Sequence, residues 1–207
     1  YIIATPIGNL KDITLRALEI LKEVDLVLAE DTRVTRKIFE RYEIKKELQS
    51  YHQHSSPEKI KHILDLLNEG KKIALVSDSG TPGISDPGNL LIKSIVENLK
   101  DVKIIPVPGP SALAAAASIS GFPMDKFLFL GFPPAKKKRK KFFEEVAGSK
   151  YPVIIYESTH RILKTIAGLR EASENFDVVV CRELTKKFET IIRGKVGEVE
   201  SILKETE

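Results

Sequence analysis

The stretch KKIALVSDSGTPGISDPG, residues 71–88, begins as a buried strand and continues into a loop with almost nothing to pack. From Ser77 to Gly88 it holds three glycines, two prolines, three serines and two aspartates, with Ile84 as its only aliphatic side chain. Glycine permits close backbone approach, proline fixes φ, and Ser, Thr and Asp bond to nearby amides. The loop is therefore either a rigid turn or a ligand cradle lined by backbone, and its place in the fold decides between the two.

On either side of this stretch, short apolar runs alternate with amphipathic helical segments. The expected strands are residues 1–5, 25–30, 48–52, 71–78 and 102–107. The expected helices are residues 12–24, 32–42, 57–70 (closed by Gly70) and about 86–99. Five strands alternating with four helices predict a parallel α/β sheet.

PVPGP, residues 106–110, breaks this pattern, and a second α/β series follows it. The expected strands there are residues 127–132, 151–157, 177–183 and 188–194, and the expected helices are residues 111–120, 139–146, 159–172 and a terminal one. Only a few residues separate the last two strands, so we expect them to pair antiparallel. The sequence thus predicts two α/β domains, residues 1–110 and 111–207, the second with a mixed sheet.

Composition restricts the class of protein. With 207 residues, 42% of them apolar and 30% charged, the chain has the make-up of an ordinary soluble protein. No apolar run reaches about eighteen residues and no secretory pattern opens the chain, so we expect no membrane partner. The single cysteine, Cys181, excludes an internal disulfide and suits a reducing cytoplasm. A net charge of +4 permits an anionic partner without demanding one.

The place of the loop in the expected sheet favours the cradle. It leaves the carboxyl end of the fourth strand, and this is the edge at which ligands bind in open α/β sheets. TPIGNL after the first strand and PGPSA after the fifth leave the same edge. Any one of these Gly/Pro-rich loops could be a structural turn. Three that converge on one edge predict a ligand cleft, which we expect to face the second domain.

The residues of these loops limit the kind of ligand. Neither G-x-G-x-x-G nor G-x-x-x-x-G-K-[ST] is present, and the loops have almost no Lys or Arg to neutralise a pyrophosphate. A nucleotide-dependent oxidoreductase therefore lacks its fingerprint. Main-chain groups, small hydroxyls and an apolar wall suit a nucleoside with a short polar tail and little negative charge. S-adenosylmethionine is one ligand of that description.

Three charged motifs follow strands near the expected cleft. AEDTRVTRK places Glu30, Asp31 and Arg33 after the second strand, where a helix N-cap is the alternative role. YESTHR (156–161) and CRELTKKFE (181–189) follow strands of the second domain, where surface ion pairs are the alternative. Charges gathered at strand ends beside a cleft favour a functional reading.

KKKRKK is the densest charge feature, and a helix is expected to begin beside it, after FPPA. Cations at a helix N-terminus oppose its dipole, and adjacent positive charges repel one another, so we expect an anionic partner. A nucleic-acid backbone is favoured over a merely solvated face. The residues of this basic run are Lys136, Lys137, Lys138, Arg139, Lys140 and Lys141.

YHQHSS offers two histidines, His52 and His54, as potential metal ligands. The chain has only four histidines, and no cysteine accompanies these two. We therefore expect no metal.

Eight motifs occur in the order seen in one family: ATPIGNL, ITLRAL, AEDTR, SDSGTPGISDPG, PGPSA, FLFLGF, YESTHR and RELTK. From Tyr1 to about Leu203 the chain resembles the RsmI family of small-subunit ribosomal RNA 2′-O-methyltransferases, which act on a cytidine. That family has the tetrapyrrole-methylase fold of the class III S-adenosylmethionine-dependent methyltransferases. Thr159 stands where the family commonly has proline, and a longer phrase replaces GFPPAKKKRKK. Many members also continue into a C-terminal helical extension.

The resemblance implies a cofactor cleft between the two domains, with S-adenosylmethionine as the cofactor. It also implies a cytoplasmic homodimer whose substrate is small-subunit ribosomal RNA, free or in a 30S-type subunit. Thr185 and Lys186 would close the cleft from the second domain. The cofactor residues of the first domain and the boundary would be Pro6, Gly8, Asp78, Ser79, Gly80, Thr81, Pro82, Ser111 and Ala112.

The reaction expected from this resemblance is attack of a ribose 2′-oxygen on the sulfonium methyl group, helped mainly by alignment. Glu30 and Asp31 are the candidates for a base or a positioning acid. The candidate cations are Lys186, Arg33 and Arg161, and the residues expected to orient them are Glu157, His160 and Glu183.

Two other functions stay open at this point. A methyltransferase of the same fold could act on a tetrapyrrole or a protein side chain, although the basic run argues against it. A non-catalytic RNA-binding module would have no need of three ligand-type loops.

Overall fold

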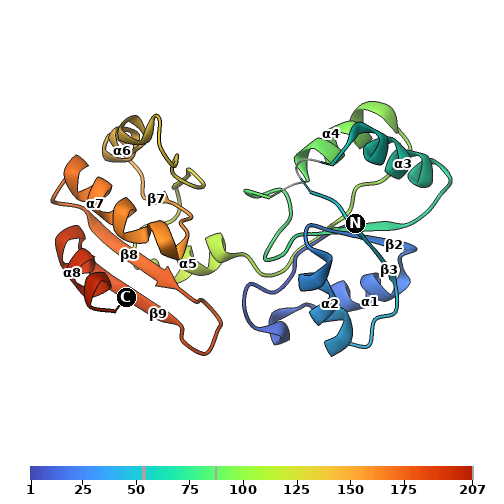
Figure 1. Cartoon of the computed structure of the whole chain (residues 1–207), viewed down its shortest axis with the longest axis horizontal. Coiled ribbons are helices and arrows are strands. Elements are labelled where there is room, and N and C mark those ends of the chain that lie inside the picture. The colour runs from blue at the N-terminus through green and yellow to red at the C-terminus, as the bar shows by residue number, and fades with distance from the viewer. Residues whose placement is uncertain (53–54, 87, 207) are drawn as a thin grey trace. The chain divides into compact units, whose positions relative to one another are not determined.

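A computed structural model describes residues 1–52, 55–86 and 88–206 of the chain (Figure 1). The chain forms two compact units, Tyr1–Ala112 and Leu113–Glu207. Each unit has its own core and is described by itself. No helix in the described part of the chain is long and apolar enough to cross a membrane.

Unit 1 contains a five-stranded parallel sheet, which confirms the predicted fold class. Its strands are β1 (Ile2–Ile3), β2 (Leu26–Ala29), β3 (Glu47–Ser50), β4 (Ile73–Val76) and β5 (Pro106–Val107). Their order across the sheet is β3-β2-β4-β1-β5. The loop after β4 therefore lies between the loops after β2 and β1, at the carboxyl end of the sheet.

Helices cover both faces of this sheet, which explains why its central strands are apolar at every position. Alternate residues of β2 show the two faces. Val27 and Ala29 join one core cluster with residues of α1 and α2, whereas Leu26 and Leu28 join another with residues of α3 and α4. The helical elements of unit 1 are η1 (Leu10–Asp12), α1 (Leu15–Glu23), α2 (Thr32–Arg41), α3 (Pro57–Asn68) and α4 (Asn89–Asn98).

The ends of these helices follow from local sequence. Thr14, Asp31 and Ser56 are N-caps whose side chains accept hydrogen bonds from amides of the first turn. Gly70 follows α3 with φ +84°, a left-handed conformation that suits glycine. α4 begins later than predicted, at Asn89 rather than near residue 86, because the Gly/Pro-rich loop extends further before the helix starts.

Unit 2 begins after α5 (Ala112–Ser120) has started, and its strands form two separate pairs. β6 (Leu128–Phe129) and β7 (Val153–Ile154) pair parallel. β8 (Asp177–Arg182) and β9 (Thr190–Lys195) pair antiparallel, which confirms the prediction for the last two strands. The single mixed sheet expected of this unit is instead two two-stranded sheets, one parallel and one antiparallel.

Three helices and both strand pairs share one core in unit 2. Phe143 of α6 (Arg139–Ala147) packs in a buried cluster with Ile166 of α7 (Ile162–Ala172) and Val199 of α8 (Val196–Thr206). A short 3-10 turn, η2 (Thr159–Arg161), precedes α7, so the predicted helix at 159–172 is present in two parts. α6 and α7, the helix that follows the YESTHR motif, therefore pack against the same core.

Gly168 of α7 provides a test of this packing. A Cβ added there would lie 2.2 Å from Cε2 of Phe143, whose side chain is buried. Gly168→Ala should therefore lower the free energy of unfolding by about 1–3 kcal/mol through overpacking, despite the better helix propensity of alanine. Gly197→Ala in α8 is the matched control, because nothing lies within 4 Å of its added Cβ. It should stabilise by about 0.5–1 kcal/mol. Urea unfolding measures both, and equal midpoints would contradict the packing.

Candidate functional site

The loops after β1 and β4 are joined by backbone hydrogen bonds. The amide of Thr5 donates to the carbonyl of Gly80 at 2.8 Å, and the amide of Gly80 donates to the carbonyl of Thr5 at 3.0 Å. Thr5 is fully buried, and its hydroxyl donates to the carbonyl of Ser77 at 3.0 Å. These three hydrogen bonds fix the loops after β1 and β4 relative to each other.

The loop after β5 contacts both of these loops. The hydroxyl of Thr81 donates to the carbonyl of Pro110 at 3.3 Å. Gly80 has φ +81°, which favours glycine, and Gly109 approaches Ala4 so closely that a Cβ would lie 3.1 Å from the Ala4 Cβ. The predicted convergence of three Gly/Pro-rich loops is therefore present within unit 1. We call these three loops, together with residues 30–31 after β2, the carboxyl rim; it comprises residues 5–9, 30–31, 77–86 and 108–112.

Carboxyl groups gather at the carboxyl rim where the loops after β2 and β4 meet. The amide of Asp31 donates to Oδ1 of Asp78 at 2.8 Å. Burial raises the pKa of Glu30, and the nearby charge of Asp78 raises it further. Burial also raises the pKa of Asp86 to about 6, with further contributions from Glu30 and Asp78 that outweigh a hydrogen bond to Ser77. The rim is thus a negatively charged surface in which two carboxyl groups hold protons more readily than usual.

Asp31 differs from its neighbour in the chain. Its Oδ1 accepts from the amide of Arg33 at 2.8 Å, as the alternative N-cap role predicts, and the Arg33 guanidinium pairs with Oδ2 at 2.6 Å. These hydrogen bonds from Arg33 lower the pKa of Asp31 to about 2. Of the two predicted bases, Glu30 alone therefore has a raised affinity for a proton.

The predicted cofactor residues of unit 1 and its end lie on the carboxyl rim or beside it. Pro6 and Pro82 are buried, whereas Gly8 and Ser79 are exposed. Thr185 and Lys186 belong to unit 2, and their approach to the rim stays a prediction. All nine residues belong to loops of the carboxyl rim, and their contact with a cofactor stays a prediction: Pro6, Gly8, Asp78, Ser79, Gly80, Thr81, Pro82, Ser111 and Ala112.

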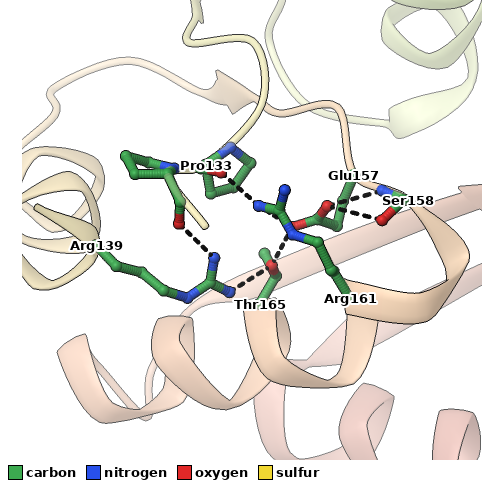
Figure 2. A network of polar contacts seen from close by, with 7 residues as sticks. Pro133, Arg139, Glu157, Ser158, Arg161 and Thr165 are labelled. Carbon is green, nitrogen blue, oxygen red and sulfur yellow. Dashed lines mark hydrogen bonds and ion pairs between the residues drawn. The ribbon is translucent and has the colours of Figure 1, made fainter. Parts of the chain in front are cut away.

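In unit 2 the YESTHR motif builds a network around Glu157, whose side chain is 4% exposed (Figure 2). The hydroxyl of Thr165 donates to Oε2 of Glu157 at 2.5 Å, and Arg161 forms an ion pair with the same oxygen at 3.2 Å. The amide of Ser158 donates to Oε1 at 2.7 Å. Glu157 thus holds Arg161, one of the cations it was expected to orient. Its catalytic role stays a prediction.

Arg139 extends this network into the basic run. Its Nη2 donates to Oγ1 of Thr165 at 2.7 Å and its Nη1 donates to the carbonyl of Pro134 at 3.1 Å (Figure 2). Arg161 likewise donates a hydrogen bond to the carbonyl of Pro133. The Arg139 guanidinium also lies 5.0 Å from the centre of the Phe143 ring. Arg139 therefore anchors the start of α6 to α7, a role that the charge pattern of the basic run does not predict.

The five lysines of the basic run are exposed. Lys138 occupies the N-cap of α6 in a left-handed conformation, without a side-chain hydrogen bond to the helix. The first turn of α6 contains no acidic residue. The conflict between the positive charges and the helix dipole is thus present as predicted, because no protein carboxylate occupies that turn.

The RELTK motif forms the loop between β8 and β9. Lys186 forms an ion pair with Glu183 at 3.0 Å, and the Lys186 amide donates to the Glu183 carbonyl at 2.9 Å. Glu183 and Thr185 are non-glycine residues with positive φ, 54° and 66°. His160 lies in η2 with an exposed side chain. Glu183 thus holds Lys186, and the catalytic roles of these residues remain predictions.

Among residues 1–52, 55–86 and 88–206, no group of three or more His, Cys, Asp and Glu side chains is arranged to hold a metal ion. Two motifs extend beyond these residues. His54 of YHQHSS and Pro87 of the opening stretch lie outside the described part of the chain.

Comparison with known proteins gives a family match over nearly the whole chain. The sequence profile of the tetrapyrrole (corrin/porphyrin) methylases matches residues 1–200. A ribosomal RNA small subunit methyltransferase I from Thermotoga maritima is 47% identical over 197 residues, which cover 95% of this chain and 88% of that protein. The protein of the same name from Escherichia coli O157:H7 is 44% identical, over 100% of this chain and 72% of its own length.

A solved structure shares the fold. A diphthine synthase has a TM-score of 0.75 at 12% identity, over 96% of this chain and 82% of that one. At this level of identity the likeness supports the architecture alone.

The raised pKa of Asp86 makes the free energy of unfolding depend on pH. Because its pKa is raised to about 6 from 3.8, the folded protein holds a proton between these values that the unfolded chain has released. The free energy of unfolding should therefore fall as pH rises from about 4 to 6. Asp86→Asn should flatten this fall and, after allowance for solvent screening, stabilise the protein by about 1 kcal/mol above pH 6. Urea titrations from pH 4 to 8 test this. Parallel curves for parent and variant would show that Asp86 does not carry the effect.

Proposed function

This chain belongs to the tetrapyrrole (corrin/porphyrin) methylase family, and we propose that it methylates small-subunit ribosomal RNA with S-adenosylmethionine as the methyl donor. Membership of the family makes it a methyltransferase, as the eight motifs predict. The observation that carries the proposed substrate is the identity of 47% over 95% of the chain to a protein named as a ribosomal RNA methyltransferase.

The carboxyl rim fits the proposed donor chemically. Its loops offer backbone carbonyls and amides, small hydroxyls and close glycine approaches, which suit a nucleoside. The carboxyl groups of Glu30, Asp78 and Asp86 provide a negative field that favours a ligand carrying sulfonium and ammonium groups. When bound, S-adenosylmethionine supplies a methyl group that the sulfonium already activates.

Glu30 is the residue that we propose as the base for the acceptor hydroxyl. Its raised pKa brings its proton affinity nearer to the working pH, which favours proton transfer. Asp31, with a pKa of about 2 and its oxygens bonded to Arg33, is a positioning residue that begins α2. Lys186 and Arg161, each held by a glutamate, stabilise the developing negative oxygen.

The finer points of the proposal concern the target and the setting of the enzyme. The acceptor is a cytidine ribose 2′-oxygen, in a cytoplasmic protein that acts as a homodimer. The exposed lysines of the basic run bind the phosphates of the RNA, because their charge is not compensated in the first turn of α6.

Transfer of tritiated methyl from S-adenosylmethionine to small ribosomal subunits tests the proposal. Nuclease mapping should find label at one ribose, in a linkage that resists alkaline cleavage. Glu30→Gln should lower turnover by about 100-fold or more, far more than it weakens cofactor binding, because Asp78 and Asp86 keep most of the negative field, and Asp31→Asn should cost less. Equal turnover of Glu30→Gln and the parent would remove Glu30 from the reaction. Cofactor binding without any RNA label would point instead to a tetrapyrrole or protein acceptor.

The salt dependence of RNA binding separates the two kinds of cation in the basic run. Lys140→Ala should make the plot of log affinity against log salt less steep, reducing the magnitude of its slope by about 0.7–0.9, because one phosphate contact is lost. Arg139→Gln also removes one positive charge, but from the residue that anchors α6 to α7. It should leave the slope unchanged and destabilise the fold by about 1–3 kcal/mol, since Thr165 and Pro134 lose a donor. Equal slope changes in the two variants would contradict the division of roles.

A further inference from the structure

The loop between β8 and β9 presents one aromatic side chain to solvent. Phe188 is 73% exposed, so the ring is accessible to a partner. The ammonium of Lys187 lies 5.4 Å from the centre of this ring, within range of a cation–π contact. An exposed ring with a cation over it offers an apolar aromatic surface next to a positive charge.

Hydrogen bonds fix the loop that carries this ring. The amide of Thr185 donates to Oε2 of Glu189 at 2.6 Å, and the hydroxyl of Thr190 donates to the carbonyl of Phe188 at 3.1 Å. The amide of Glu189 donates to the carbonyl of Lys186 at 3.2 Å. The antiparallel register Arg182↔Thr190 closes the loop directly behind these bonds. The exposure of Phe188 is thus a property of an ordered hairpin, and the ring needs little ordering on binding.

The charges around the ring favour an anionic partner. Arg182, Lys186 and Lys187 lie in the loop or at its end, against the two carboxylates of Glu183 and Glu189. Glu183 is paired with Lys186, and Glu189 accepts the Thr185 amide. Both carboxylates are therefore engaged, whereas Lys187 extends beside the exposed ring.

We propose that Phe188 is a base-stacking residue, whose ring stacks on an unpaired nucleobase of the RNA while Lys187 contacts the neighbouring phosphate. Aromatic rings beside cations bind unpaired bases in this way, because every base offers a π face. The inference rests on the proposed function, since it places the acceptor ribose near Lys186. Lys186 and Phe188 are two positions apart in the chain, so their Cα atoms lie within about 7 Å of each other. This matches the reach from a ribose to its own or an adjacent base.

Three substitutions separate stacking from mere apolar contact. Phe188→Tyr keeps the aromatic face, Phe188→Leu keeps an apolar side chain without it, and Phe188→Ala removes both. Binding of a short single-stranded RNA, measured by fluorescence anisotropy, should weaken by about 5- to 150-fold in the Leu and Ala variants and stay near the parent value in the Tyr variant. A 2-aminopurine base in the RNA should be quenched by the parent and the Tyr variant but not by the Leu variant.

Equal RNA affinity of the Leu and Tyr variants, with equal quenching, would overturn the proposal. So would a loss of dimer in Phe188→Ala with RNA binding intact, because the ring would then serve a protein interface. S-adenosylmethionine affinity and the unfolding midpoint, which should not change, show that the variants remain folded. Methylation of RNA by Phe188→Leu at the parent rate would defeat the stacking role while the proposed function stands. Quenching by a parent protein that methylates no RNA would support the stacking role and contradict the proposed function.

Discussion

The pair of hydrogen bonds between Thr5 and Gly80 is the constraint on which the carboxyl rim depends. Parallel strands leave their loops at one edge of a sheet, but nothing in that topology obliges the loops to touch. The exchange of amide and carbonyl between these two residues joins the loops, and the buried hydroxyl of Thr5 adds a third bond to Ser77. Gly80 can take part because its left-handed backbone costs glycine little. A ligand therefore meets a surface that is already ordered, which reduces the entropy lost on binding.

Most of the scaffold could be predicted from the sequence, because hydrophobic period and turn residues are local signals. The alternation of apolar runs with amphipathic segments predicted the parallel sheet of unit 1, and Gly70 marked the end of α3. The division of unit 2 into two strand pairs was not predictable in the same way. Whether short strands such as β6 and β7 join a larger sheet depends on tertiary packing, and the sequence pattern of each strand is the same in either case.

The chemistry of the site was predictable in kind but not in detail. Glu30 and Asp31 are adjacent acids after the same strand, yet their proton affinities move in opposite directions. One is half-buried beside Asp78, and the other accepts hydrogen bonds from Arg33. Arg139 shows the same limit. Only the fold shows that its guanidinium meets Thr165, although a single arginine among lysines was a signal, since arginine suits several fixed acceptors at once.

The position of β1 between β4 and β5 also affects how the chain folds. β1 precedes the other four strands in the sequence, but its neighbours are β4 and β5, with Ile2 opposite Leu75 and Pro106. Its pairing with β4 needs about seventy residues to follow, and its pairing with β5 needs about a hundred. Contacts of such long sequence separation are slow to form, because loop closure comes before the stabilising contacts. The Thr5–Gly80 link should therefore form late in folding, and an N-terminal fragment that ends before β4 should expose its first strand to aggregation.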